Sequence, residues 1–211
     1  MTQPHVQLDG IDVALRPGTR KLLTVRQTRD YFARITLWEL EDGTWVERAA
    51  TDGRIGNGGL ADPNQRLERT MATPRGTYRL LYAFGTHRRR RAWRLGYRRI
   101  GRGDYWVGDN ASPHYNRWRH KREGGFRTRL GEDQPNVSER LADYPKAYEY
   151  AMVVDFNYDE QVRKRGFAIF LHVQGEKGTG GCVAVPRPFM KMLLAELGPE
   201  DDPLIAIGPS R

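Results

Sequence analysis

The chain has very little cysteine and no long hydrophobic run, and each shortage excludes a class of protein. Cys182 is the only cysteine among 211 residues, so the chain forms no internal disulfide and no zinc site of paired cysteines. The longest apolar run, Ala168 to Val173, is interrupted by His172 and falls far short of the roughly 20 residues that cross a bilayer. The sequence therefore predicts a protein without a transmembrane segment.

Targeting and cofactor motifs are also missing. The first 18 residues contain no apolar stretch of the kind that a secretory signal requires. We therefore expect a cytoplasmic protein if the chain is full length, or an exported protein whose signal is absent from this sequence. Gly56-Asn57-Gly58-Gly59 lacks the lysine and the helix that follow a phosphate loop. His114 and His120 lie in a polar stretch without a third ligand, so we expect no metal and no other cofactor.

Positive charge is in excess. Lys and Arg number 35 against 26 Asp and Glu, which gives a net charge of +9. Eight arginines lie in the segment Arg88–Arg102, with Trp93 and Tyr97 among them. This mixture predicts contact with anionic polymers. No recognisable nucleic-acid-binding fold surrounds the segment, so we do not expect specific nucleic-acid binding. A solvated loop, or a general bias towards arginine codons, is the alternative explanation.

The hydrophobic pattern predicts a mostly β protein. Apolar and polar residues alternate from Tyr31 to Leu40, and Asp42-Gly43 separates this run from Thr44-Trp45-Val46, which predicts a β-hairpin. Further strands are expected at 77–84, 105–107, 151–156, 167–173, 182–185 and 204–207. With 23 Gly and 12 Pro between and around these runs, the chain is typical of a β-sandwich or barrel-like sheet with long loops.

One or two short helices complete the predicted fold. Apolar residues recur at helical spacing from Phe189 to Leu197, between Pro188 and Gly198-Pro199, and predict one helix. A second helix is expected at 138–148, although Pro145 disfavours it. No shift in composition indicates a second domain. We expect residues 1–20 to be an N-terminal tail or edge segment and residues 21–208 to form the single domain.

The segment from Ala168 to Pro186 carries the chemistry. A strand ends near His172, a glycine-rich loop follows, and Cys182 begins another strand. Because side chains alternate along a strand, His172 shares a face with Ala168 and Phe170. A thiol attacks as its thiolate, and a histidine within hydrogen-bond reach provides the base. We expect the loop to join two antiparallel strands and so bring the two residues together. A buried structural cysteine beside a core histidine is the alternative.

These residues resemble a known family. Thr179-Gly180-Gly181-Cys182-Val183 resembles the cysteine motif of the L,D-transpeptidase catalytic domain (the YkuD-like family), and Phe170-Leu171-His172-Val173 resembles its histidine strand. The upstream segments that agree with a branch of this family are 51–56, 73–78, 104–109, 112–116 and 138–141. The resemblance spans roughly residues 21–208, and its specific part is the block from the histidine to the cysteine.

The resemblance implies a single-domain β-sandwich of the L,D-transpeptidase type and a cofactor-independent enzyme. Such enzymes attack a tetrapeptide stem of peptidoglycan, release the terminal D-alanine, hold the acyl group as a thioester and pass it to an amine of a neighbouring stem. By matching positions, Cys182 is the nucleophile and His172 the general base and then acid. The N–H groups of Gly181 and Cys182, with Gly180 as a third, would bind the oxyanion. A backbone carbonyl usually orients the histidine.

The resemblance also implies acylation by carbapenems and an extracytoplasmic location at the cell wall. There, the Arg88–Arg102 segment would contact anionic wall polymers. Expected substrate-binding residues are Thr179 and Gly180 of the motif, together with side chains from the preceding loops, namely Trp106, Tyr115, Asn116, Glu139 and Arg165. The aromatic residues would cover the acyl-enzyme and the polar ones would bind a zwitterionic peptide, whereas a core role for the aromatics is the alternative.

Two departures from the family pattern leave the reaction open. Common members have Ser-His-Gly-Cys, with Arg or Asn two residues after the cysteine, whereas this chain has Thr-Gly-Gly-Cys and Ala184. The interval between His172 and Cys182 is shorter than in common members, which indicates a more open groove that admits water. The first alternative is therefore an L,D-carboxypeptidase that hydrolyses the same stems. The second is a catalytically inactive, basic module that binds cell-wall polymers.

Overall fold

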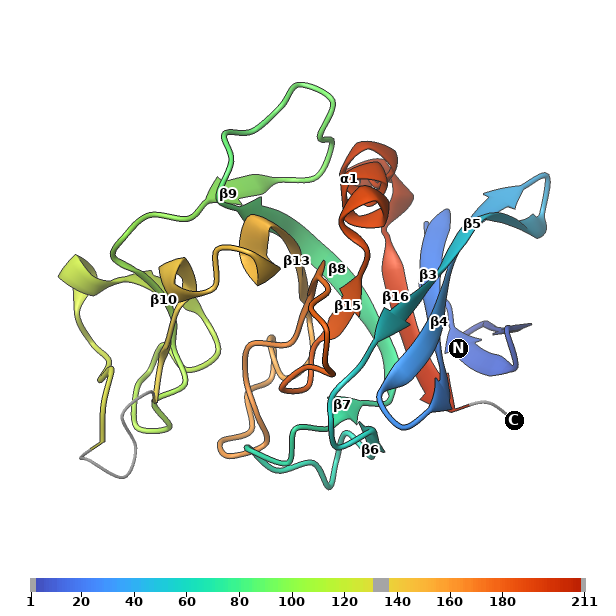
Figure 1. The fold of residues 1–211 in the computed structure, drawn as a ribbon. Coiled ribbons are helices and arrows are strands. Elements are labelled where there is room, and N and C mark those ends of the chain that lie inside the picture. The colour runs from blue at the N-terminus through green and yellow to red at the C-terminus, as the bar shows by residue number, and fades with distance from the viewer. Residues whose placement is uncertain (1–2, 131–136, 210–211) are drawn as a thin grey trace.

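The computed structural model describes residues 3–130 and 137–209 (Figure 1). Its strands, in chain order, are β1 (His5–Leu8), β2 (Ile11–Ala14), β3 (Lys21–Arg29), β4 (Phe32–Glu41), β5 (Thr44–Arg54), β6 (Leu60–Ala61), β7 (Thr73–Pro74), β8 (Gly76–Gly85), β9 (Tyr97–Arg99), β10 (Asp104–Trp106), β11 (Trp118–His120), β12 (Glu139–Arg140), β13 (Tyr150–Val154), β14 (Phe170–Val173), β15 (Val183–Val185) and β16 (Leu204–Pro209). Its helices are α1 (Arg187–Glu196) and the short 3-10 helices η1 (Lys121–Glu123), η2 (Leu141–Asp143), η3 (Ala147–Glu149) and η4 (Pro199–Asp201).

The β4–β5 hairpin is formed as the alternating pattern predicts. The two strands pair antiparallel from Phe32↔Arg54 to Glu41↔Thr44. Asp42 and Gly43 form the turn with φ values of 49° and 82°. Positive φ at both central residues matches the right-handed twist of the flanking strands, and glycine and aspartate tolerate it better than most residues.

The main sheet closes on itself. Its strand order is β13-β14-β15-β5-β4-β3-β16-β8-β9, and β13 also pairs with β8. Eight strands therefore form a closed ring, and β9 extends it beside β8. One junction is narrow, because β15 meets β5 through the single residue pair Ala184↔Arg54. The chain is mostly β and forms one β-rich domain, as predicted. The two layers of the expected β-sandwich correspond to opposite sides of this closed sheet.

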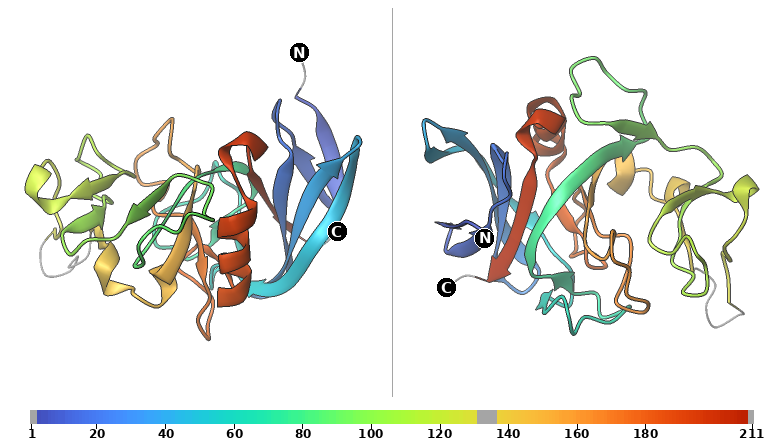
Figure 2. Two further views of the ribbon diagram at one scale, coloured as in Figure 1. Left: turned by 90° about the horizontal axis from the view of Figure 1, so that it is seen from above. Right: turned by 180° about the vertical axis from the view of Figure 1, so that it is seen from behind.

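The interior of the closed sheet is filled by inward-facing side chains and by α1. Leu23, Ile35, Leu171 and Val183 belong to one buried cluster that also contains Met190 of the helix. In Figure 2 the red helix α1 lies between the blue strands of the N-terminal half and the green and yellow part of the chain. Burial of this helix face, rather than the intrinsic helix propensity of ten residues, stabilises α1. The prediction of a helix with Pro186 and Pro188 at its start and Gly198-Pro199 at its end is confirmed.

The expected second helix at 138–148 is not formed. This segment instead contains the short strand β12 and the start of η3, with η2 between them. Pro145 lies between the two 3-10 helices, where its ring and missing N–H prevent a continuous α-helix. Tyr148 marks a further break, because its φ and ψ of −95° and 26° are not helical.

Within the described part of the N-terminal segment, residues 3–20, two strands are formed. Strands β1 and β2 form an antiparallel hairpin that lies beside the main sheet (Figure 1). Leu8, Ile11 and Val13 pack there against Leu22 and Leu204. Residues 5–14 are therefore an edge hairpin that is packed on the domain, rather than a free tail.

Strands β14 and β15 run parallel, which corrects the expectation of an antiparallel pair. The register places Leu171 beside Val183 and His172 beside Ala184. The connecting loop first returns along the end of β5, where the N–H of Thr179 donates to the carbonyl of Ile55 at 2.9 Å. Only after this return does the chain enter β15, and it therefore enters in the same direction as β14. A parallel connection this short is unusual, since most need a dozen or more residues.

The predicted alternation of side chains along the histidine strand is correct. Ile169 and Leu171 lie in the interior cluster. Ala168 and Phe170 lie in a second apolar cluster together with Cys182. This second cluster fills the space between the closed sheet and the three-stranded sheet β11-β10-β12. The cysteine is therefore held where these two sheets meet.

Candidate active site

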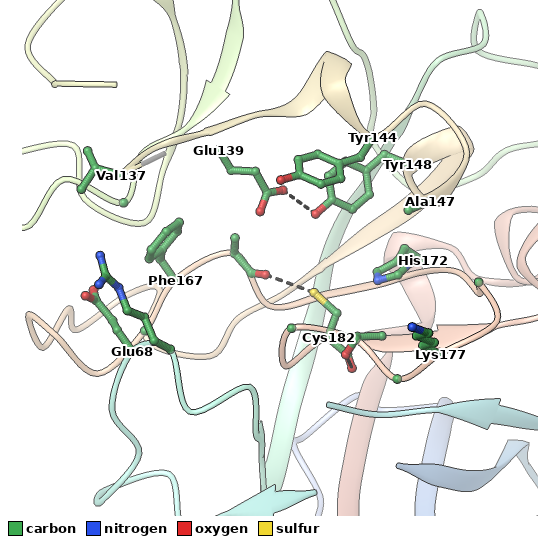
Figure 3. Close-up of a pocket in the computed structure, with 18 of the residues that line it drawn as sticks. Glu68, Val137, Glu139, Tyr144, Ala147, Tyr148, Phe167, His172, Lys177 and Cys182 are labelled. Carbon is green, nitrogen blue, oxygen red and sulfur yellow. Dashed lines mark hydrogen bonds between the residues drawn. The ribbon is translucent and has the colours of Figure 1, made fainter. Parts of the chain in front are cut away.

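A cavity of about 860 Å³ lies at this junction (Figure 3). Cys182 and His172 both line it, as do Glu139, Tyr148 and the loop that precedes the cysteine. His172 comes from β14, Cys182 from the residue before β15, and Glu139 from β12. In Figure 3 the Glu139 and Tyr148 side chains lie across the cavity from the thiol. The structure thus brings Glu139 and Tyr148 to the segment that contains His172 and Cys182.

Cys182 is held by backbone groups of the histidine strand. Its Sγ–H donates to the carbonyl of Ala168 at 3.2 Å, and the N–H of Phe170 donates to Sγ at 3.3 Å. Only 8% of the residue is exposed. Burial raises the pKa of the thiol to about 12, and the carboxyl group of Glu139 acts in the same direction. At neutral pH the resting group is therefore the neutral thiol.

His172 is oriented by its own strand. Its Nδ1 lies 2.8 Å from the carbonyl oxygen of Val173, and since a carbonyl only accepts, Nδ1 carries the proton. Nε2 is then the unprotonated nitrogen. Burial lowers the pKa of the imidazole to about 4, so the ring is neutral at pH 7. Val173 supplies the orienting carbonyl that the sequence did not identify.

A network of hydroxyl groups fixes the loop before the cysteine. The Thr179 hydroxyl donates to the Cys182 carbonyl at 2.6 Å and accepts the N–H of Gly181 at 3.1 Å. The Thr73 hydroxyl also donates to the Cys182 carbonyl, at 3.3 Å. The threonine of the Thr-Gly-Gly-Cys motif therefore closes the turn that positions Cys182.

Among the expected oxyanion donors, Gly181 has an internal partner. Its N–H is engaged by Thr179, and it does not line the cavity, whereas Gly180 and Cys182 do. Gly181 has a φ of 129°, and a Cβ there would lie 2.8 Å from Nη2 of Arg66. The glycine is needed for this backbone conformation and this close approach.

The half-buried Glu139 and the buried Tyr148 form a hydrogen-bonded pair above the thiol. The Tyr148 hydroxyl donates to Oε1 of Glu139. The Tyr148 ring packs edge-on against the imidazole of His172, with 5.6 Å between ring centroids. Burial raises the pKa of Glu139 to about 7, which is opposed by the hydrogen bond from Tyr148. Both protonation states of this carboxyl group are therefore accessible near neutral pH.

Arg66 is the cation that the sequence did not reveal. It lines the cavity with only 5% of its surface exposed. Its Nε donates to the carbonyl of Ala72 and its Nη1 to that of Arg165, both at 2.8 Å. The positive charge lowers the pKa of Cys182, against the larger effect of burial. Arg66, Arg69 and Arg75 lie within ten residues, and a sequence pattern does not show which of the three enters the cavity.

Three of the expected substrate-binding residues are internal. Trp106, Tyr115 and Asn116 are at most 2% exposed and do not line the cavity. The Trp106 Nε1–H donates to Oδ1 of Asn116 at 2.7 Å, and the same oxygen accepts the N–H of Ala168 at 3.1 Å. These side chains support the residue whose carbonyl meets the thiol. The Tyr115 hydroxyl donates to Glu68 at 2.8 Å.

Arg165 does not line the cavity either, and it contributes its backbone instead. Its carbonyl accepts the hydrogen bond from Arg66, whereas its guanidinium donates to the carbonyl of Asn64 at 3.4 Å. Of the expected substrate-binding residues, Thr179, Gly180 and Glu139 are the ones that line the cavity.

The Arg88–Arg102 segment forms an exposed loop and the strand β9. Arg88 to Arg91 are exposed, whereas Trp93 is only 4% exposed. The Trp93 ring packs against Tyr97 and Tyr150, with centroid distances of 4.7 Å and 5.8 Å. The tryptophan is therefore part of the core and cannot stack on a nucleic-acid base.

The described residues contain neither a membrane-spanning helix nor a metal-binding cluster. Within residues 3–130 and 137–209, no helix has both the length and the apolar character that a membrane span requires. In the same residues, no three His, Cys, Asp or Glu side chains gather in a way that would hold a metal ion.

Comparison with known proteins identifies a family. Residues 27–205 match the family model described as the L,D-transpeptidase catalytic domain, YkuD. The chain has no significant match among curated proteins. One similar solved structure is Bdellovibrio bacteriovorus Bd1075, which is 14% identical. The alignment covers 99% of this chain and 51% of that chain, with a TM-score of 0.46, so this chain spans about half of that protein's length.

Proposed function

We propose, since this chain belongs to the L,D-transpeptidase catalytic domain family, that it is a cysteine acyltransferase that cross-links peptidoglycan stem peptides through a thioester. The observation that carries the proposal is that Cys182 and His172 line one cavity, with Nε2 of His172 left free to accept a proton. The cavity is large enough for a peptide, because small-molecule sites commonly occupy 300–1,000 Å³.

In the first half-reaction, Nε2 of His172 takes the proton of Cys182 as Sγ attacks the carbonyl of the scissile bond. Both groups are neutral at rest, so the ion pair forms only during attack, when the substrate has displaced water from the cavity. His172 then gives the proton to the leaving amine of the terminal residue. The product is a thioester on Cys182.

The negative charge on the tetrahedral intermediate requires donors. The Cys182 and Gly180 N–H groups belong to residues that line the cavity, and we assign them this role. Gly181 acts by shaping the turn, because its own N–H is held by Thr179. Arg66 adds a fixed positive charge behind the loop.

Hydrolysis of the same stems is the alternative reaction. A cavity of this size admits water to the thioester, and water and an amine compete for one intermediate. The choice between transfer and hydrolysis depends on whether the site binds and activates an amine. We further assign the enzyme to the cell wall, where the exposed arginines of the Arg88–Arg102 segment would retain it on anionic polymers.

Incubation with a disaccharide-tetrapeptide, with and without an amine acceptor, tests the proposal. We expect loss of the terminal residue in both samples, and a cross-linked product only when the acceptor is present. Cys182→Ala is expected to abolish both, and Arg165→Ala, a change near the cavity but outside its lining, is the matched control. A wild-type protein that binds the peptide and leaves its mass unchanged would indicate the inactive polymer-binding module.

A further inference from the structure

Glu139 is an acidic side chain in the cavity without a cationic partner. One carboxyl oxygen, Oε1, accepts the Tyr148 hydroxyl. Within residues 3–130 and 137–209, Oε2 has no hydrogen-bond donor and no Lys, Arg or His forms an ion pair with the carboxyl group. The cations that line the cavity are at its rim, as with Lys146 and Lys177, or are hydrogen-bonded to backbone carbonyls, as with Arg66.

Transfer to an amine imposes a chemical requirement that hydrolysis does not. An alkyl amine is an ammonium ion at neutral pH and must lose a proton before its nitrogen can attack a carbonyl. His172 has returned its proton to the leaving group and is available for one proton only. A second base beside the thioester is therefore useful for transfer, and it should also attract a cation.

We propose that Glu139 is the acceptor-side base: it binds the ammonium group of the incoming stem and removes its first proton. The inference rests on the proposed function, and it names the residue that favours transfer over hydrolysis. Glu139 lines the same cavity as Cys182, and Figure 3 shows its carboxyl group on the opposite side of the space above the thiol. An acceptor between the two would lie against both.

The proton balance is complete with the groups present. The ammonium gives one proton to Glu139 and becomes the free amine. Its nitrogen then forms a bond to the thioester carbon, and Nε2 of His172 takes the second proton from that nitrogen. When the tetrahedral intermediate collapses, the C–S bond breaks and His172 returns this proton to Sγ of Cys182. Glu139 releases the first proton to solvent, which its pKa of about 7 permits near neutral pH.

Tyr148 is the positioning residue for this base. Its hydroxyl fixes one oxygen of Glu139, while its ring contacts His172. The base on the acceptor side and the base on the nucleophile side are therefore held against one aromatic side chain. Tyr144, whose ring lies 5.4 Å from that of Tyr148, and the exposed Lys146 are further titratable groups that line the cavity.

The test separates acylation from transfer. Three proteins are compared: wild type, Glu139→Gln, and the matched control Glu176→Gln, which makes the same change at the exposed rim of the cavity. Acyl-enzyme formation with the tetrapeptide is followed by intact mass, and its decay is measured in water, in an alkyl amine acceptor and in hydroxylamine. Hydroxylamine is unprotonated at neutral pH and therefore needs no acceptor-side base.

For Glu139→Gln we expect transfer to the alkyl amine to fall about 100-fold, with acylation and transfer to hydroxylamine changed by less than about threefold. Glu176→Gln is expected to resemble wild type in all three reactions. An equal loss with both acceptors, or a loss confined to acylation, would overturn the assignment. If the wild type itself forms no acyl-enzyme, the proposed function fails, and this result is distinct from failure of the Glu139 assignment.

Tyr148→Phe provides a second measurement. This variant keeps the ring and removes the hydroxyl that fixes Glu139. We expect a smaller loss of alkyl-amine transfer than in Glu139→Gln, with hydroxylamine again unaffected. An unchanged alkyl-amine rate in both variants would exclude the pair from transfer.

Discussion

The alkylation rate of Cys182 should rise steadily with pH and show no plateau near neutrality. The variable in the experiment is pH, and Cys182 is the only thiol in the chain, so the alkylation rate refers to this residue alone. Burial raises the pKa of this thiol from 9.0 to about 12. For an acid, a raised pKa favours the protonated form, so at pH 7 the thiolate fraction is about 10³-fold below that of an ordinary cysteine.

A more basic thiolate is also a better nucleophile, which offsets part of this loss. The intrinsic reactivity of a thiolate rises by about 0.4–0.5 log units per unit of pKa. Slightly more than half of the roughly 10³-fold decrease, counted in log units, therefore remains as a decrease in the alkylation rate. Alkylation of the folded protein at pH 7 should therefore be roughly 50-fold slower than that of the unfolded chain. Between pH 6 and 10 the logarithm of the rate should rise by about one per pH unit.

The assay is reaction with iodoacetamide followed by intact mass, for the wild type and for His172→Gln. Because the imidazole is neutral above pH 4, it contributes no charge that would stabilise a resting thiolate. The variant should keep the slope of the pH profile while losing turnover with the tetrapeptide. A plateau below about pH 8 in the wild type, lost in the variant, would show a resting thiolate–imidazolium pair and refute this account.

Other outcomes follow from the same site. Cys182→Ala should retain the fold by circular dichroism and lose all product formation, since the small side chain contributes more to chemistry than to packing. A carbapenem should add its intact mass to the wild type and not to this variant; absence of an adduct on a thiol that iodoacetamide still alkylates would contradict the acyl-enzyme mechanism. Gly181→Ala should lower the free energy of unfolding by about 2 kcal/mol, measured by urea denaturation, because a Cβ would meet Arg66 at 2.8 Å and the φ is 129°. Retention on cell-wall material through the Arg88–Arg102 segment should be released by high salt, and salt-independent retention would exclude an electrostatic surface.

The sequence predicts the strands well because their signal is local. Alternation of apolar and polar residues follows directly from the geometry of a half-buried strand, and the turn at Asp42-Gly43 has its own residue preference. The same alternation gives the correct face for His172. The predicted antiparallel direction of β15 was wrong. The direction of this strand depends on the hydrogen bond between Thr179 and the end of β5, which is a long-range contact that local sequence does not show.

The sequence predicts the site residues that are close to one another in the chain, and it does not predict those that only the fold brings together. His172 and Cys182 lie in one short segment, so spacing and residue type suffice. Arg66 reaches them from the loop before β7, and only the fold brings it close. Trp106 and Tyr115 have side chains that suit both a core and a groove, so composition alone cannot decide between them. The structure places them in the core.

Closure of the main sheet affects how the protein behaves at high concentration. A sheet with free edges exposes unpaired N–H and C=O groups that can pair with another chain and begin aggregation. In the closed ring of eight strands each strand has a neighbour on both sides, and β9 adds a further strand of only three residues beside β8. Arg98 and Arg99 on β9 are exposed. Short length and positive charge both disfavour edge-to-edge pairing, so these two arginines oppose self-association through this edge of the main sheet.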